Sequence, residues 1–183
     1  MFFTTSNSVR LSFQTYGNPC NRAMLLIHRL GADGQMWGPQ IKLFPDQGYY
    51  LIVPDVRGHG QSSEVETFSI EDCARDMVEL IDHLGIETVT VVGVSMGGVI
   101  AQQLACDYPD ALDKLILCDT FSAVRSIKTK IGGWFVKGNR QIAENIPQSR
   151  FVVLENSMDP SNLVAAECFN REVLVFLQNK DVE

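Results

Sequence analysis

The sequence has little histidine and no excess of positive charge, and both shortages limit the possible functions. Three histidines occur among 183 residues, and none has another at metal-ligand spacing, so we expect no metal site. The formal net charge is -7 at pH 7, which disfavours binding to the phosphate backbone of nucleic acids. No apolar run reaches the roughly 20 residues that cross a bilayer, so we predict no membrane partner.

A secretory signal and paired cysteines are also missing. The N-terminus lacks the basic head and long apolar stretch of a signal peptide. The five cysteines are an odd number without a Cys-x-x-Cys pair, so we predict reduced thiols, mostly packed in the core, in a cytoplasmic protein. A content of 45% hydrophobic and 20% charged residues is typical of a globular chain, and we predict a single domain over residues 1–183.

Apolar runs alternate with helical patterns along the chain. An alternating stretch at 8–16 predicts a half-exposed strand, and continuous apolar runs predict buried strands at 24–27, 50–53, 89–92, 115–117 and 151–154. Apolar stripes predict helices at 70–84, 99–105 and 164–177. Ser69 with Asp72 favours a helix start, and Gly85 favours a left-handed end.

Buried strands alternating with helices predict an α/β fold with a mostly parallel central β-sheet flanked by helices. The carboxyl ends of parallel strands share one edge, where open α/β sheets bind their ligands. The segments that begin at His28, Asp55, Ser95, Asp119 and Asn156 each follow a predicted strand. We therefore expect the functional residues among them.

The segment Gly93-Val94-Ser95-Met96-Gly97 fits the pattern G-x-S-x-G between a predicted strand and a predicted helix. A serine on such a sharp turn needs neighbours without side chains, and Gly93 and Gly97 meet that need. The first amides of the following helix face the same space and favour an oxyanion.

Three motifs in this order resemble the α/β-hydrolase family. Ile27–Gly31 is similar to its His-Gly-x-Gly oxyanion loop, Pro54–Ser62 to its Asp-x-Arg-Gly-x-Gly-x-Ser loop, and Gly93–Gly98 to its nucleophile turn. Within the family, the chain most resembles 3-oxoadipate enol-lactonase-like and small carboxylesterase-like members. The resemblance implies a cytoplasmic enzyme that needs no cofactor and acts on small-molecule esters or lactones.

The resemblance also implies roles for individual residues. Ser95 would be the nucleophile, and the backbone N–H groups of Leu30 and Met96 would form the oxyanion hole. Arg29 departs from the family's glycine, and its side chain could alter the path of the loop that carries Leu30.

The family's catalytic histidine is missing. Where the family has Gly-His after the last strand, this chain has Met158-Asp159, and no histidine follows His83. We interpret His28, His59 and His83 as structural. Asp159 could act as the base only if burial raised its pKa well above about 3.9.

The family's acid is not identifiable either, because 126–139 contains no carboxylate. Asp119, which follows the 115–117 strand, is a possible acid, because some relatives place their acid there. More often such a residue only ties down a loop.

The family's helical cap is also largely missing, with an apparent internal deletion near 121–139. Residues 121–135 resemble the start of a cap, and 140–146 already resembles the helix before the last strand. We therefore predict a reduced core in which Ser95 faces open solvent and the 151–154 strand pairs directly beside 115–117. Exposed Met96, Trp134 and Phe135 would favour a homo-oligomer.

Three functional hypotheses remain open. The first is a serine hydrolase of carboxylic esters or lactones, with activity reduced by the incomplete triad. The second is a non-catalytic protein of the same fold that binds a ligand or partner. The third is a piece of a longer enzyme.

Overall fold

The computed structural model describes residues 1–120, 152 and 160–178, and its centre is one six-stranded sheet. The strand order is β1-β2-β4-β3-β5-β6. The strands are β1 (Phe2–Thr4), β2 (Arg10–Tyr16), β3 (Arg22–Ile27), β4 (Tyr49–Pro54), β5 (Val89–Val94) and β6 (Leu112–Cys118). β1 and β2 are antiparallel to their neighbours, and β4, β3, β5 and β6 are parallel. The predicted α/β fold is confirmed.

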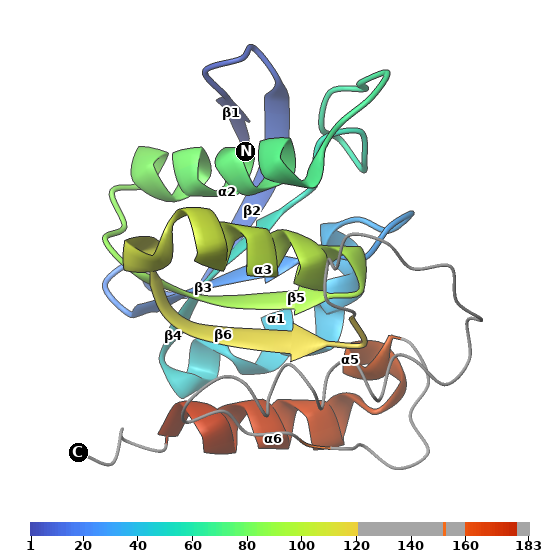
Figure 1. Ribbon diagram of the computed structural model, residues 1–183. Helices are drawn as coiled ribbons and strands as arrows, with labels where there is room; N and C mark the ends of the chain where they lie inside the picture. Colours follow the sequence, from blue (N-terminus) through green and yellow to red (C-terminus); the bar gives the residue numbers. More distant parts are fainter. Residues whose placement is uncertain (121–151, 153–159, 179–183) are drawn as a thin grey trace.

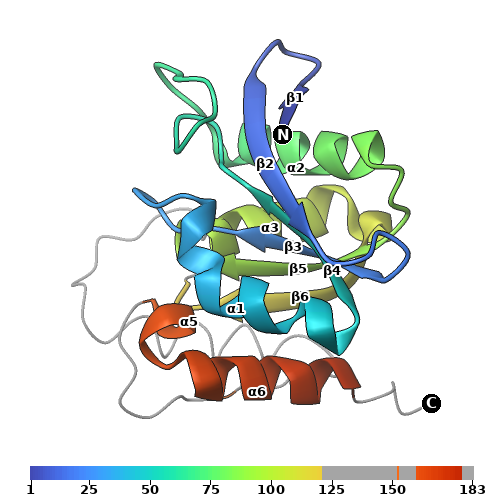
Figure 2. The same ribbon diagram turned by 180° about the vertical axis from the view of Figure 1, so that it is seen from behind.

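Helices cover both faces of the sheet (Figures 1 and 2). The α-helices are α1 (Gly38–Leu43), α2 (Ile70–His83), α3 (Met96–Asp107), α5 (Ser161–Val164) and α6 (Ala166–Gln178). The 3₁₀ turns are η1 (Gly34–Trp37), η2 (Pro45–Gln47) and η3 (Pro109–Ala111). α2 and α3 lie on one face, and α1 and α6 on the other.

Alternation along the buried strands divides the core into two layers. In β3, Leu25 and Ile27 pack in the layer under α2 and α3, while Met24 and Leu26 pack in the layer that includes α6 residues. Because successive side chains of a strand point to opposite faces, a strand with helices on both sides must be apolar throughout. This is why the continuous apolar runs predicted β3, β4 and β5 correctly.

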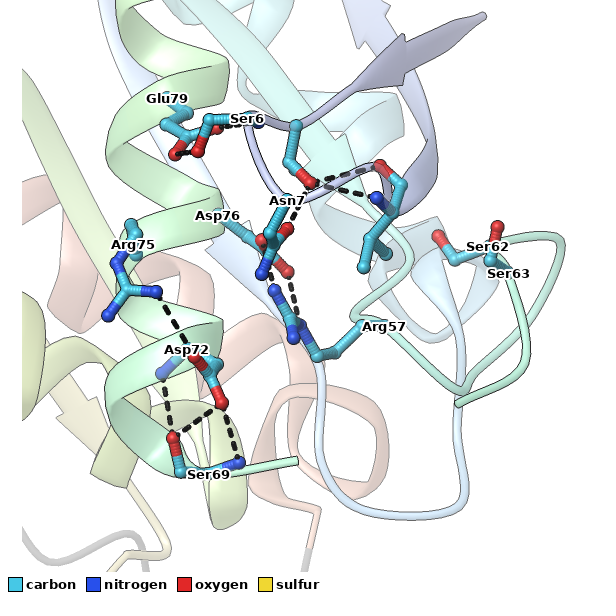
Figure 3. Close-up of polar contacts among 12 residues, drawn as sticks. Ser6, Asn7, Arg57, Ser62, Ser63, Ser69, Asp72, Arg75, Asp76 and Glu79 are labelled. Atoms are coloured by element: carbon cyan, nitrogen blue, oxygen red, sulfur yellow. Dashed lines mark hydrogen bonds and ion pairs between the residues drawn. The ribbon is translucent and has the colours of Figure 1, made fainter. Parts of the chain in front are cut away.

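The ends of α2 form as the sequence predicts. The Ser69 side chain accepts a hydrogen bond from the Asp72 amide, and the Asp72 carboxylate accepts one from the Ser69 amide, which makes a capping box (Figure 3). Gly85 follows with a φ of 68°, in the left-handed region.

The helix predicted over 164–177 is observed as α6 (Ala166–Gln178), which Ala165 (φ -122°, ψ 42°) separates from the short α5 before it. One prediction about local structure is wrong. Most cysteines are not in the core: Cys73 and Cys118 are buried, but Cys20, Cys106 and Cys168 are exposed. The three exposed cysteines lie in turns or on helix faces that the sheet does not cover.

Several predictions fall, apart from Val152, outside the described residues. They are the deletion near 121–139, the helix at 140–146, the exposed Trp134 and Phe135, and the strand at 151–154. The predicted pairing of that strand beside β6 therefore stays a prediction. In the part of the chain that the structure describes, no helix is long and apolar enough to cross a membrane.

A buried ion pair joins the loop after β4 to α2 (Figure 3). The Arg57 guanidinium donates to both Asp76 carboxylate oxygens at 2.7 and 2.6 Å, and the two side chains are 5% and 1% exposed. Burial raises the pKa of the Asp76 carboxyl against the opposing pull of Arg57. An Asp76 carboxylate without its partner would therefore be costly.

We predict that Arg57→Ala lowers the free energy of unfolding by about 3–5 kcal/mol, because it leaves a buried carboxylate unpaired. Urea denaturation would measure the loss. Arg75→Ala is the matched control, since Arg75 pairs with Asp72 at 3.2 Å with both side chains partly exposed. Its loss should stay below about 1 kcal/mol, and equal losses for the two variants would contradict the assigned role of the buried pair.

Candidate active site at the carboxyl edge of the sheet

Ser95 occupies a sharp turn between a strand and a helix. β5 ends at Val94 and α3 begins at Met96, so one residue connects them. Ser95 has φ 53° and ψ -115°, a conformation that side-chain-bearing residues rarely adopt. The sequence prediction of a strained serine between strand and helix is therefore supported by the backbone.

Glycines make this turn possible. A Cβ atom at Gly93 would overlap the carbonyl oxygen of Gly97, and one at Gly97 would overlap the carbonyl oxygen of Ile27. At Gly98 the added atom would lie 2.5 Å from the Thr120 side chain. The first turn of α3 thus packs directly on the backbone ends of the neighbouring strands.

The backbone of Ser95 is held by the end of β6. The Ser95 amide donates to the Cys118 carbonyl at 3.0 Å, and the Thr120 hydroxyl donates to the Ser95 carbonyl at 2.7 Å. Ser95 itself is half-buried. The prediction that it faces open solvent concerns the cap segment, which falls outside the described residues, and stays a prediction.

The two proposed oxyanion donors follow paired positions of neighbouring strands. Ile27 of β3 is in register with Gly93 of β5, and Leu30 and Met96 each lie three residues further on. Among the described residues, neither amide has a hydrogen-bond acceptor. Leu30 is 62% exposed and Met96 is half-buried. Within the described part of the chain, the structure therefore assigns no other acceptor to these two amides.

The loop after β3 is fixed by His28, which is fully buried. Its Nδ1 lies 2.8 Å from the Arg29 carbonyl, and its Nε2 accepts a hydrogen bond from the Val56 amide at 2.9 Å. Both ring nitrogens are used, so the ring is a neutral imidazole that carries its proton on Nδ1. Burial lowers the pKa of His28, and the neighbouring His59 lowers it further.

The other two histidines also have structural contacts. His59 Nδ1 lies 3.0 Å from the Arg57 carbonyl, and its ring packs 5.1 Å from that of His28. His83 is exposed near the end of α2, where it stacks on Phe3 at 4.7 Å. Because all three histidines lie in the described part of the chain, the structure accounts for each, and none is seen to hydrogen-bond to Ser95 or Asp119.

Hydrogen bonds of Asp55 hold the loop Asp55–Ser62 in place. The Asp55 carboxylate accepts from the Gly34 amide and from the Gln61 amide, both at 2.9 Å. A Cβ at Gly60 would overlap that carboxylate, and the Ser62 hydroxyl donates to the Asp55 carbonyl at 2.6 Å. The motif therefore ties the loop after β4 to the loop that carries Leu30.

Asp119 lies next to Ser95 but contacts α5. Its carboxylate accepts a hydrogen bond from the Ser161 amide at 2.7 Å. Asp159, the other possible acid or base, falls outside the described residues. Within the described ranges, no group of three or more metal-binding side chains occurs.

The chain belongs to the α/β-hydrolase family, whose model matches residues 22–159. It is 36% identical over 121 residues to 3-oxoadipate enol-lactonase 2 of Acinetobacter baylyi, a match that covers 66% of this chain and 45% of that protein. The match covers less than half the length of this and the other curated relatives. What those whole enzymes do is therefore transferred below only as a proposal.

Solved structures are similar in the same way. A thermophilic esterase from Thermogutta terrifontis is 32% identical, with a TM-score of 0.63 over 78% of this chain and 50% of that one. A predicted CIB-like hydrolase from Thermoplasma acidophilum has a TM-score of 0.86 and 22% identity over 98% of this chain and 97% of that one. This second likeness shows the fold alone.

We predict that Gly97→Ala distorts the turn, because the added methyl would meet the backbone of Ile27. The free energy of unfolding should fall by roughly 1–3 kcal/mol, which thermal or urea unfolding would measure. Gly38→Ala is the matched control, since nothing lies within 4 Å of a Cβ there and φ is -46°. Equal effects at both positions would show that the close packing at Gly97 does not constrain the fold.

We predict that stability declines on acidification in a way that depends on His28. Its folded pKa is lowered, so the unfolded chain binds more protons as pH falls. The stabilisation is fully present above the unfolded pKa of about 6.5 and is lost below it, at up to about 1.4 kcal/mol per pH unit. Unfolding curves at several pH values between about 5 and 7.5 would show this slope.

His28→Gln should flatten that slope, whereas His83→Gln, which changes an exposed ring, should leave it unchanged. An unaltered slope in His28→Gln would assign the pH dependence to other groups.

Proposed function

We propose that this chain is a serine hydrolase of carboxylic ester or lactone bonds, with Ser95 as its nucleophile. The observation that carries the proposal is the strained serine on a glycine-packed turn at the carboxyl edge of the sheet. The enol-lactonase and esterase relatives support the same bond types.

The proposed chemistry is acyl transfer through the serine. The Ser95 Oγ attacks the carbonyl carbon, and the former carbonyl oxygen takes the negative charge. The Leu30 and Met96 amides would stabilise this oxyanion by a few kcal/mol. Collapse of the intermediate breaks the bond to the leaving oxygen and leaves an acyl-serine, which water then hydrolyses. For a lactone the leaving oxygen stays on the same molecule.

A base must accept the Ser95 proton, and this is where we expect the activity to be reduced. Asp159 stands in sequence where the family has its histidine, and we propose it as the candidate base. Asp119, the other carboxylate considered from the sequence, has its side chain bonded to the Ser161 amide. In a well-studied serine hydrolase, removing the histidine alone costs about a million-fold in turnover.

A non-catalytic binding protein of the same fold is the second candidate. The specific observation in its favour is that all three histidines are accounted for by other contacts. In that case the turn at Ser95 would be a feature of the fold, and the free amides would hold an anionic group of a ligand.

We also propose a cytoplasmic location from the predicted reduced thiols, and self-association through Met96 and its surroundings.

We predict that the chain hydrolyses p-nitrophenyl acetate faster than Ser95→Ala does, and that a fluorophosphonate labels Ser95. The label requires an activated serine, because it forms a covalent bond to Oγ. Initial rates and mass spectrometry of labelled peptides would measure both effects.

Ser6→Ala is the matched control, since Ser6 lies on the β1–β2 turn and contacts Glu79 of α2 (Figure 3). It should keep the full rate and the label. Equal turnover by the unaltered chain and Ser95→Ala, without labelling, would reject the hydrolase and favour the binding protein.

A further inference from the structure

Asp119 adopts a left-handed backbone conformation, which is uncommon for a residue with a side chain. Its φ is 45°, and in the described part of the chain only Ser8 and Ser95 share positive φ without being glycine. Such a conformation is unfavourable for a residue with a side chain and persists only where surrounding contacts determine it. Here the contacts are known: Cys118 and Thr120, on either side, both bind the backbone of Ser95.

With both neighbours bound to Ser95, the Asp119 carboxylate reaches α5. Its partner, the Ser161 amide, lies 42 residues further along the chain and belongs to a residue only 5% exposed. α5 lies beside the carboxyl end of β6 (Figure 1). A charge-assisted bond of 2.7 Å at such a site is stronger than a neutral one.

A buried polar cluster also holds α5. The Asn162 side chain, fully buried, donates to the Met36 carbonyl at 3.1 Å and to Gln40 Oε1 at 3.2 Å. The side-chain Nε2 of Gln40 donates in turn to the Asn162 backbone carbonyl at 3.0 Å and to Oδ1 of Asn170 in α6 at 2.8 Å. Thus α5 is tied to η1 and α1, which follow the loop that carries Leu30.

These contacts connect the two sides of the Ser95 site through α5. One side is the end of β6, which holds the backbone of Ser95; the other is the segment after β3, which supplies the Leu30 amide. Asp119 has no histidine to orient, since the three histidines have other contacts.

We propose that Asp119 is a positioning residue, whose carboxylate fixes α5 against the Ser95 site through the Ser161 amide. The functional part of this inference depends on the proposed role of Ser95, whereas the contact itself does not. A carboxylate that acts as a hydrogen-bond acceptor is replaceable by an amide, but one that supplies charge to a base is not.

Four variants separate these roles. Asp119→Asn keeps an acceptor oxygen and removes the charge, and Asp119→Ala removes both. Ser161→Pro deletes the donor N–H and also exchanges the side chain for a ring. Proline suits the first position of α5, and Pro160 already has the extended angles (φ -91°, ψ 126°) that precede a proline. Ser161→Ala keeps the amide and is the matched control.

The first measurement is hydrogen exchange of the Leu163–Ala165 amides, which needs no activity. Asp119→Ala and Ser161→Pro should each speed exchange on the order of tenfold, and the double variant should be no faster than either, because both remove one interaction. Ser161→Ala should match the unaltered chain, and Asp119→Asn should fall between the unaltered chain and Asp119→Ala, because it keeps an acceptor but loses the charge. Unchanged exchange in Asp119→Ala and Ser161→Pro would overturn the proposal.

The second measurement is the rate of fluorophosphonate labelling at Ser95. Asp119→Ala and Ser161→Pro should slow it on the order of tenfold through misplacement of the site, and Asp119→Asn should restore it. Loss of labelling in Asp119→Asn with full labelling in Ser161→Pro would overturn the positioning role and make Asp119 the acid. If the unaltered chain is not labelled at all, the hydrolase proposal fails, while the exchange experiment still decides the contact.

Discussion

The close packing of α3 on the ends of its neighbouring strands is the constraint on which the rest of the structure depends. Gly97 leaves no room for a Cβ beside the Ile27 carbonyl, and Gly98 leaves none beside Thr120. Because the helix begins this close to β3 and β6, the connection from β5 takes a single residue. That residue must then adopt positive φ, and its side chain stands at the edge where the loops after all three strands converge.

The position of Ser95 is determined by backbone contacts rather than by a catalytic partner. Cys118 and Thr120 hold its amide and carbonyl, and the β3–β5 register sets the Leu30 and Met96 amides at equal steps beyond paired residues. None of these contacts requires a histidine. The backbone geometry of the turn at Ser95 is therefore independent of the histidine that the family places after its last strand.

Local sequence patterns predicted the helices and strands that depend on residues close together in the sequence. Continuous apolar runs predicted the buried strands, and Ser69 with Asp72 predicted the start of α2. The sequence did not predict α1, because Gly38-Pro39 resembles a break; proline is in fact tolerated in the first turn of a helix, where its missing N–H has no partner to lose. It could not predict that Asp119 binds Ser161, since no pattern connects two residues 42 positions apart.

The strain at Ser95 bears on the choice between enzyme and binding protein. A glycine would adopt φ 53° at little cost, because it has no Cβ to clash with the backbone. A serine there costs on the order of 1–3 kcal/mol, a noticeable fraction of the 5–15 kcal/mol that stabilises a typical domain. A feature of the fold alone gives no reason to keep a serine rather than a glycine at this position. The strain therefore supports the proposed role of Ser95 as the nucleophile.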